Sequence, residues 1–301
     1  MYALLLAALA VLLSGVAPRL MARLGSFRRA PRAALVAWQA VSLAGVLAAL
    51  LAAPAAVPAL GEVGWLACVG DCTMTLAWFR AQRWIVVALA GAVTLAVLGR
   101  LLLSGHRIGT RLRAARARHR DLVDVLGAPA GEGREDGIRV LDHTTPTAYC
   151  LPGRRSRVVL TEGALAALPD DELAAVLAHE RAHLRGRHDL LLEWFTVLHH
   201  SVPEPVRSPA ALREVRLLVE ALADRAAVRT SGPVTTARAL MTLAQGQAPE
   251  AGLGAGGDGT TATRMRLLAE DALPAPTVVV MYVYAVAVVA LPLVLLWLAW
   301  R

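Results

Sequence analysis

The stretch PDDELAAVLAHERAHLRG, residues 169–186, decides how the chain is interpreted. Asp170 follows a proline and is typical of a helix N-cap, and the two acidic residues after it suit the positive end of a helix dipole. Gly186 is typical of a helix end. The pattern therefore predicts an α-helix over Asp171–Arg185.

The predicted helix carries a motif with metal-site spacing. His179 and His183 are four residues apart, so they lie on one helix face and can hold one Zn²⁺ between them. Glu180 comes one residue along, close enough to take a proton from an attacking water. The motif predicts a hydrolytic zinc site with one ion per chain.

A catalytic zinc with two histidines needs a third protein ligand and one open position. A second predicted helix, which opens at Ser208, carries Glu220 and Asp224 on one face of an otherwise apolar stretch. Carboxylates on such a face are costly to bury without a partner, and a metal with its histidine supplies one. The alternative is an exposed helix edge, where these carboxylates pair with Arg216 and Arg229. The histidine motif favours the metal site.

The remainder of this region reads as a mixed α+β domain. Short stretches rich in β-branched residues predict strands, and apolar periodicity predicts further helices. A glycine-rich segment, Gln245–Thr263, predicts a flexible loop. The predicted strands are Ile138–Asp142, Thr147–Leu151 and Arg157–Thr161, and the other predicted helices are Glu162–Leu168, Leu190–His200 and Pro209–Thr230.

The composition excludes an ordinary soluble domain. Of the 301 residues 56% are hydrophobic, against about 45–50% in average globular chains. Four apolar stretches predict membrane-spanning helices. A signal peptide is the alternative for the first stretch, but no basic residue precedes it and no small-residue cleavage site is obvious. The predicted spans are Met1–Ala17, Ala33–Val57, Trp84–Leu103 and Thr277–Trp300, the last within a terminal segment 277–301.

The net charge of +8 lies beside these spans rather than on one domain. Five arginines lie in the loop Pro18–Arg32, and six more lie in residues 104–120 without an acid. This pattern predicts that both loops face the cytoplasm, and it argues against direct nucleic-acid binding. Residues 104–276 then form a cytoplasmic domain between spans three and four, and both termini lie outside the plasma (inner) membrane. The segment Arg107–Gly127 is expected to be a basic helix near the lipid headgroups.

The three cysteines carry little information. Cys68 and Cys72 fall in the predicted outside loop, where a disulfide and two unpaired thiols are equally compatible with the spacing. Cys150 lies on the cytoplasmic side and is expected to be reduced. None of the three has metal-site spacing.

The region from Tyr149 to Ala227 resembles the gluzincin membrane metallopeptidases. The residues that carry this resemblance are AYCLPG at 148–153, VVLTEG at 158–163, the HERAH motif and EALAD at 220–224. Three spans before the zinc domain and one after it are similar to the BlaR/MecR family of antibiotic-responsive signal-transducing proteases. The β-lactam receptors of that family add an extracellular penicillin-binding domain after the fourth span, whereas this sequence ends at Arg301. We therefore do not expect this chain alone to sense β-lactams.

The resemblance implies roles for particular residues. His179, His183 and Glu220 become zinc ligands, Glu180 the base, and Asp224 a residue that orients a ligand histidine. An edge strand near Tyr149–Leu151 is expected to line the substrate cleft. The sequence leaves open whether Tyr149 or Arg225 stabilises the oxyanion. His188 is a further candidate for the cleft, although a solvated loop position is the expected one.

We therefore expect an integral-membrane zinc endopeptidase that faces the cytoplasm. By resemblance its substrate is a cytoplasmic transcriptional repressor, and it also cleaves itself within or just after Gln245–Thr263, near Arg264–Arg266. The alternatives are a quality-control protease of the HtpX type and a non-catalytic membrane adaptor with a structural zinc. The lipid bilayer is an expected partner, and the sequence leaves a homodimer open.

Overall fold

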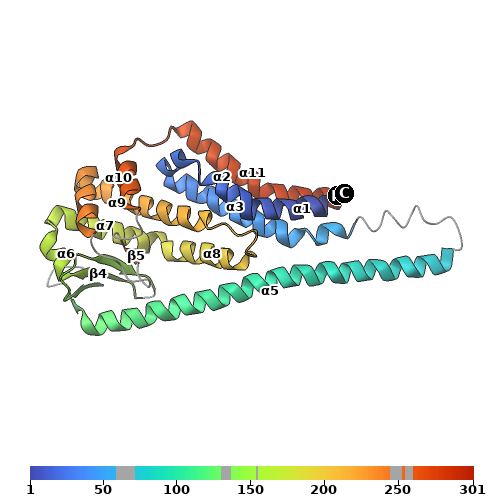
Figure 1. The fold of residues 1–301 in the computed structure, drawn as a ribbon, viewed down its shortest axis with the longest axis horizontal. Coiled ribbons are helices and arrows are strands. Elements are labelled where there is room, and N and C mark those ends of the chain that lie inside the picture. Colours follow the sequence, from blue (N-terminus) through green and yellow to red (C-terminus); the bar gives the residue numbers. More distant parts are fainter. Residues whose placement is uncertain (59–71, 130–136, 154, 245–252, 255–259) are drawn as a thin grey trace.

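A long helix, α5, runs beside the other elements and links two regions of the molecule (Figure 1). One region is a small β-sheet with helices packed on it, and the other is a group of apolar helices. The computed structural model describes residues 1–58, 72–129, 137–153, 155–244, 253–254 and 260–301. The helices are α1 (Tyr2–Val11), α2 (Ala17–Met21), α3 (Pro31–Leu51), α5 (Cys72–Leu126), α6 (Glu162–Ala167), α7 (Asp170–Gly186), α8 (His188–Ser201), α9 (Ala210–Leu243), α10 (Thr261–Ala269) and α11 (Ala275–Ala299). The strands are β1 (Ala128–Pro129), β2 (Ile138–Leu141), β3 (Ala148–Leu151), β4 (Arg157–Thr161) and β5 (Leu253–Gly254).

Four helical stretches among the described residues are long and apolar enough to cross a membrane. They agree in number with the predicted spans, but the bounds differ. The first stretch reaches Met21 rather than Ala17, and the fourth begins at Ala275 rather than Thr277. The second helix ends at Leu51 rather than Val57, because Pro54 begins a separate 3₁₀ turn. The third continues past Leu103 to the end of α5. The four stretches are Tyr2–Met21, which joins α1 and α2 through a π-helical turn, Pro31–Leu51, Trp84–Leu126 and Ala275–Ala299.

The helices α1, α3 and α11 pack against one another. Small side chains lie where they meet: Ala44 and Ala48 of α3 are fully buried, and Leu6 of α1 packs against Ala48. Small residues let apolar helices approach closely, which is how helices associate in a bilayer. The two chain ends lie together at the end of this helix group that is farther from the sheet (Figure 1).

The sheet has the order β1-β2-β4-β3-β5. The strands β2 and β4 are parallel, and the other neighbouring pairs are antiparallel. The three predicted strands are confirmed as β2, β3 and β4. The sequence analysis missed β1 and β5, which are two residues long and therefore too short for an alternating pattern.

The two faces of the sheet are covered by different helices. Cys150 of β3 and Leu160 of β4 face a core that includes Val176 of α7. On the opposite face, Tyr149 packs with Val123, near the end of α5. The segment Arg107–Gly127 does continue the third span as a helix, as far as Leu126, and the end of this helix covers the sheet. Its position near the lipid headgroups stays a prediction.

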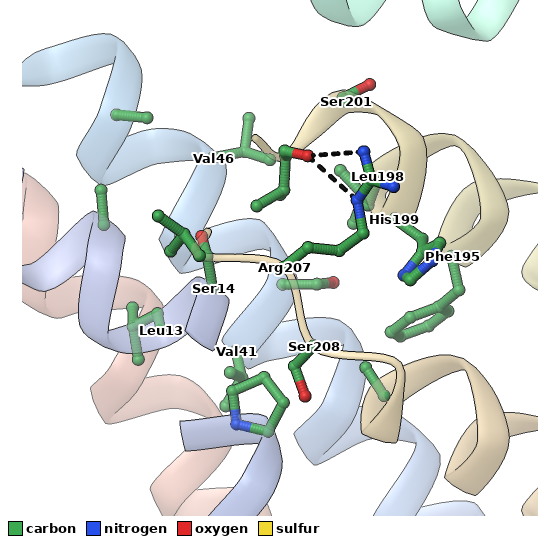
Figure 2. A pocket seen from close by; sticks show the side chains of 18 of the residues that line it. Leu13, Ser14, Val41, Val46, Phe195, Leu198, His199, Ser201, Arg207 and Ser208 are labelled. Atoms are coloured by element: carbon green, nitrogen blue, oxygen red, sulfur yellow. Dashed lines mark hydrogen bonds between the residues drawn. The ribbon is translucent and has the colours of Figure 1, made fainter. Parts of the chain in front are cut away.

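The turn between α8 and α9 lies beside the apolar helices. It borders a cavity of about 330 Å³ that is also lined by parts of α1, α3 and α5. In Figure 2, Arg207 reaches back to the carbonyl oxygen of Val202, to which its Nε and Nη2 donate hydrogen bonds of 3.2 and 3.1 Å. This contact lies within the turn that precedes α9. The Ser208 hydroxyl then accepts a hydrogen bond from the amide of Ala210, as expected of a residue at a helix start.

Helix α9 is longer than the predicted Pro209–Thr230. Its backbone breaks at Gly232, where φ is +80°, and a further helical segment follows as far as Leu243. A glycine followed by a proline is typical of a helix end, and the predicted helix stopped two residues before this pair. The continuation packs on the sheet side, where Ala239 and Leu240 join the core beneath α7.

Gly163 provides a test of this fold. A Cβ atom at Gly163 would lie 2.0 Å from the carbonyl oxygen of Thr144, so the first turn of α6 has no room for one. We expect Gly163→Ala to lower the free energy of unfolding by about 1–3 kcal/mol. Thermal unfolding followed by tryptophan fluorescence measures the effect. A matched control is Gly91→Ala on α5, where a Cβ meets nothing within 4 Å; equal melting temperatures for the two variants would contradict the packing described.

Candidate metal centre

Helix α7 presents its two histidines and Glu180 to the interior of the domain. Its first turn contains three acidic residues, which stabilise the helix dipole, although the N-cap is Pro169 rather than the predicted Asp170. His179 and His183 are almost completely buried, and Glu180 is fully buried. The predicted helix is therefore confirmed, and its motif lies beneath the surface.

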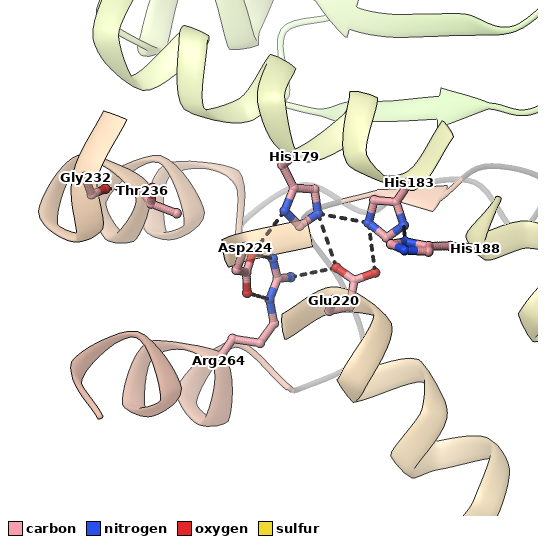
Figure 3. Close-up of polar contacts among 8 residues, drawn as sticks. All are labelled: His179, His183, His188, Glu220, Asp224, Gly232, Thr236 and Arg264. Carbon is pink, nitrogen blue, oxygen red and sulfur yellow. Dashed lines mark hydrogen bonds and ion pairs between the residues drawn. The ribbon is translucent and has the colours of Figure 1, made fainter. Parts of the chain in front are cut away.

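Helix α9 crosses α7 and brings Glu220 to the histidines (Figure 3). The Nε2 atoms of His179 and His183 lie 3.1 Å apart. One carboxylate oxygen of Glu220 lies 3.5 Å from His179 Nε2, and the other lies 3.4 Å from His183 Nε2. The structure thus brings together the three residues that the sequence analysis proposed as ligands.

This donor set fits a zinc ion. Ligand atoms of the three residues all lie within 4.8 Å of one another. A tetrahedral zinc with bonds of about 2.0–2.2 Å needs ligand atoms roughly 3.3–3.6 Å apart, close to the spacing observed. Two imidazoles and one carboxylate also match the donors of catalytic zinc sites, which leave a fourth position open.

Asp224 and Arg264 hold this cluster from behind (Figure 3). Asp224 Oδ1 lies 3.0 Å from Nδ1 of His179, the ring nitrogen that faces away from Glu220. Arg264 of α10 donates from Nε and Nη2 to the two oxygens of Asp224, at 2.8 and 2.5 Å, and its Nη1 lies 3.1 Å from Glu220 Oε2. Asp224 and Arg264 are 2% and 1% exposed, so their charges offset each other in the interior.

The sequence analysis gave Arg264 a different role. It expected a self-cleavage point near Arg264–Arg266, next to the loop Gln245–Thr263. In the structure Arg264 is buried in a helix, and a helix cannot present its carbonyl groups to a metal site, so that expectation is wrong. Most of the loop lies outside the described residues. The contact with Asp224 spans 40 residues, and no local pattern in the sequence marks it.

His188 contacts His183 at the ring nitrogen that faces away from Glu220. Its Nδ1 atom is 3.0 Å from Nδ1 of His183, and the side chain is buried, which contradicts the expected solvated loop position. Gly186 makes this possible, because a Cβ there would lie 2.4 Å from the His188 ring. Burial lowers the pKa of His188 to about 4, so the ring is neutral and its Nδ1 can accept a hydrogen bond from the Nδ1–H of His183. That contact orients the His183 ring, as partners of metal ligands do.

The electrostatic environment gives the carboxyl groups of Glu180 and Glu220 different pKa values. Burial raises the pKa of Glu180 to about 7, and neither of its oxygens has a hydrogen-bond partner among the described residues. Burial also acts to raise the pKa of Glu220, but His183, Arg264 and His179 outweigh it and lower that pKa to about 2. Glu220 is therefore a permanent anion, suited to hold a cation, while Glu180 can exchange a proton near neutral pH.

The two histidines on α7, His179 and His183, also differ in pKa. Burial acts to lower the pKa of His179, but Asp224 and Glu220 raise it to about 9. Burial lowers the pKa of His183 to about 3. In the absence of a metal, a proton shared among His179, Asp224 and Glu220 is therefore favoured. A divalent cation would replace that proton.

Two candidate residues are not at the centre. The Tyr149 hydroxyl contacts Nε2 of His119 on α5 at 2.9 Å, on the sheet face opposite to α7. Arg225 donates from Nη2 to the carbonyl oxygen of Arg29. Neither side chain contacts the metal-ligand cluster, so the structure does not support either as the oxyanion donor.

The expectation that the strand near Tyr149–Leu151 is an edge strand is also wrong. Strand β3 lies between β4 and β5, and its backbone pairs with Leu253 and Gly254 on the side away from β4. Cys150 of β3 is buried, and burial together with the negative charge of Glu180 raises the pKa of its thiol. A neutral thiol is a poor nucleophile, so cysteine chemistry is not favoured. Cys68 and the side chain of Cys72 lie outside the described residues.

Comparison with known proteins gives one match. Residues 113–202 match Peptidase family M48. No curated protein and no solved structure matches the chain. The matched residues contain the end of α5, the three longer strands, α7 and α8, but neither Glu220 nor Arg264. The match indicates a metallopeptidase domain, and four apolar helices indicate a membrane protein.

Arg264 allows a direct test of the cluster. Removing its charge with Arg264→Met leaves the carboxylates of Asp224 and Glu220 without their guanidinium partner, and Asp224 loses the contacts that hold it against His179. We expect zinc affinity to fall by about 10–100-fold, the usual effect of removing a partner of a metal ligand. Competition with a chelator, followed by metal analysis, measures this. The control is Arg266→Met, an exposed residue two positions along α10. Equal zinc affinity in the two variants would show that Arg264 does not support the centre.

Proposed function

We propose that the chain is an integral-membrane zinc endopeptidase whose zinc domain faces the cytoplasm. One observation carries the proposal: ligand atoms of His179, His183 and Glu220 converge within 4.8 Å, beside the buried carboxylate of Glu180. The M48 match and the four candidate spans support it. A structural zinc site is normally closed by a fourth protein ligand, and none of the described residues supplies one here.

In this proposal each side chain has a defined task. His179, His183 and Glu220 hold the zinc, which when bound supplies a Lewis acid that polarises the scissile carbonyl. Glu180 takes a proton from the attacking water and delivers it to the leaving amide nitrogen. A pKa of about 7 suits this exchange in both directions near neutral pH. Asp224 and His188 fix the orientation of the two ligand imidazoles.

The orientation in the membrane follows from the arginines. The loop between the first two candidate spans carries five arginines, and positively charged short loops stay in the cytoplasm. Four spans then place both termini outside the plasma membrane, with residues 104–276 inside. The proximity of the two chain ends in Figure 1 is consistent with their lying on the same side.

The substrate class rests on the resemblance to signal-transducing proteases. We propose that the enzyme cleaves a cytoplasmic transcriptional repressor in response to a signal, with self-cleavage as an activating step. Direct contact with nucleic acid is not part of this proposal, and neither a monomer nor a homodimer is required by it. The alternative is a protease that removes damaged membrane proteins.

Quantitative proteomics of cells that carry Glu180→Ala in place of the wild-type chain tests the proposal. Without the proton acceptor the domain keeps its ligands but loses cleavage, so we expect one cytoplasmic protein to accumulate in the variant cells. The matched control is Glu204→Ala, the same substitution at an exposed glutamate. Accumulation of many membrane proteins instead would favour quality control. No change in any protein would contradict both peptidase functions and favour a non-catalytic adaptor.

A further inference from the structure

A basic cleft lies where α5, the β3–β4 turn and the α7–α8 junction meet. It has a volume of about 660 Å³, and arginines from two segments of the chain line it. Asp189 is the one acidic residue among its described lining residues. The arginines are Arg113, Arg116 and Arg120 of α5, together with Arg185 and Arg187 at the end of α7.

The acids near the cleft neutralise only part of this charge. Arg116 lies 3.4 Å from Asp189 and 3.6 Å from Glu193, and Arg113 lies 2.8 Å from the same glutamate. Arg120 donates to the carbonyl oxygen of Pro152 rather than to an acid. Neither Arg185 nor Arg187 forms an ion pair with any described residue. The cleft therefore keeps an excess of about three positive charges, which favours an anionic ligand.

The backbone at Arg187 adds an independent observation. Arg187 has φ of +48°, and it is the one residue other than glycine with positive φ in the described part of the chain. Helices usually end with a glycine in this conformation. Here the glycine comes one residue earlier, because a Cβ at Gly186 would collide with His188. The strained position is thus occupied by an arginine that lines the cleft, and strained residues concentrate at binding and catalytic sites.

The position of the cleft distinguishes between anionic ligands. Along α5, Arg113 to Arg120 lie roughly 15–25 Å beyond Leu103, the end of the apolar stretch, at about 1.5 Å per residue. The headgroup layer extends only about 5–8 Å beyond the hydrocarbon, so the cleft lies outside its reach. In contrast, the cleft shares the end of α7 with the metal centre: its lining residues Leu184 and Asp189 directly follow His183 and His188 in the sequence.

We propose that this basic cleft binds an acidic segment of the polypeptide that the metal centre cleaves. The inference rests on the proposed peptidase function and adds to it a substrate preference. Carboxylates of the substrate pair with the arginines that have no acidic partner, so the peptide is held beside α7 while its scissile bond lies at the metal centre. Because such contacts are partly exposed, binding weakens as the salt concentration rises.

The test measures peptide binding separately from cleavage. The full-length, zinc-loaded Glu180→Ala protein is titrated into labelled deca-glutamate, and fluorescence anisotropy gives the affinity. Deca-glutamine and a ten-nucleotide thymidine oligonucleotide serve as neutral and nucleic-acid probes. In that background, Arg120→Gln, Arg185→Gln and Arg187→Gly are combined to remove the three cleft charges that have no acidic partner; the glycine also relieves the backbone strain at this position. The control combines Arg229→Gln, Arg238→Gln and Arg266→Gln, three exposed arginines outside the cleft.

We expect the cleft variant to bind deca-glutamate about tenfold more weakly than its parent, and the control variant to differ less than about twofold. If both variants bind deca-glutamate equally weakly, the loss of affinity reflects net charge alone, and the proposal is overturned. Deca-glutamine binding as tightly as deca-glutamate would also overturn it, as would tighter binding of the oligonucleotide through the same arginines. If the acidic peptide binds as expected while cells with Glu180→Ala accumulate no protein, the peptidase function fails and the acidic-peptide site remains.

Discussion

The candidate metal centre depends on one charge cluster, in which Arg264 contacts Asp224 and Glu220 while Asp224 contacts His179. Each of these charges alone would cost several kcal/mol to bury. Together they offset one another, and they do so only if α7, α9 and α10 are packed in one arrangement. The cluster therefore couples the position of Glu220 to the position of His179. Two carboxylates face one guanidinium, which leaves negative charge for a cation.

This arrangement explains the division of labour among neighbouring groups. Arg264 and the histidines keep Glu220 ionised, whereas Glu180 is buried without a hydrogen-bond partner among the described residues and has a raised pKa. A ligand must stay charged to hold its cation, and a proton carrier must change its charge during the reaction. Two glutamates from crossing helices thus acquire different properties from their surroundings. The same helix, α7, ends at the basic cleft, so metal ligands and charged surface share one rigid element.

Local patterns and the family resemblance were sufficient to predict the candidate ligands and Asp224, but not the contacts of Arg264 and His188. The spacing of His179 and His183 and of Glu220 and Asp224 predicted two helix faces, because helical periodicity is a local property. Arg264 lies 40 residues beyond its partner, and such a contact depends on packing that no local pattern encodes. Strand alternation could separate Tyr149 from Cys150, yet it could not tell which face would meet α7. His188 was missed because its burial depends on the missing Cβ of Gly186.

The central claim is that Glu220 is a metal ligand and Glu180 is not. Zinc content per chain, measured on purified wild-type, Glu180→Ala and Glu220→Ala proteins after identical dialysis, tests this claim most directly. The account predicts about one zinc per chain in the wild type and in Glu180→Ala, in keeping with a single three-ligand site, and a large loss in Glu220→Ala. Loss of zinc from Glu180→Ala with full retention in Glu220→Ala would contradict it.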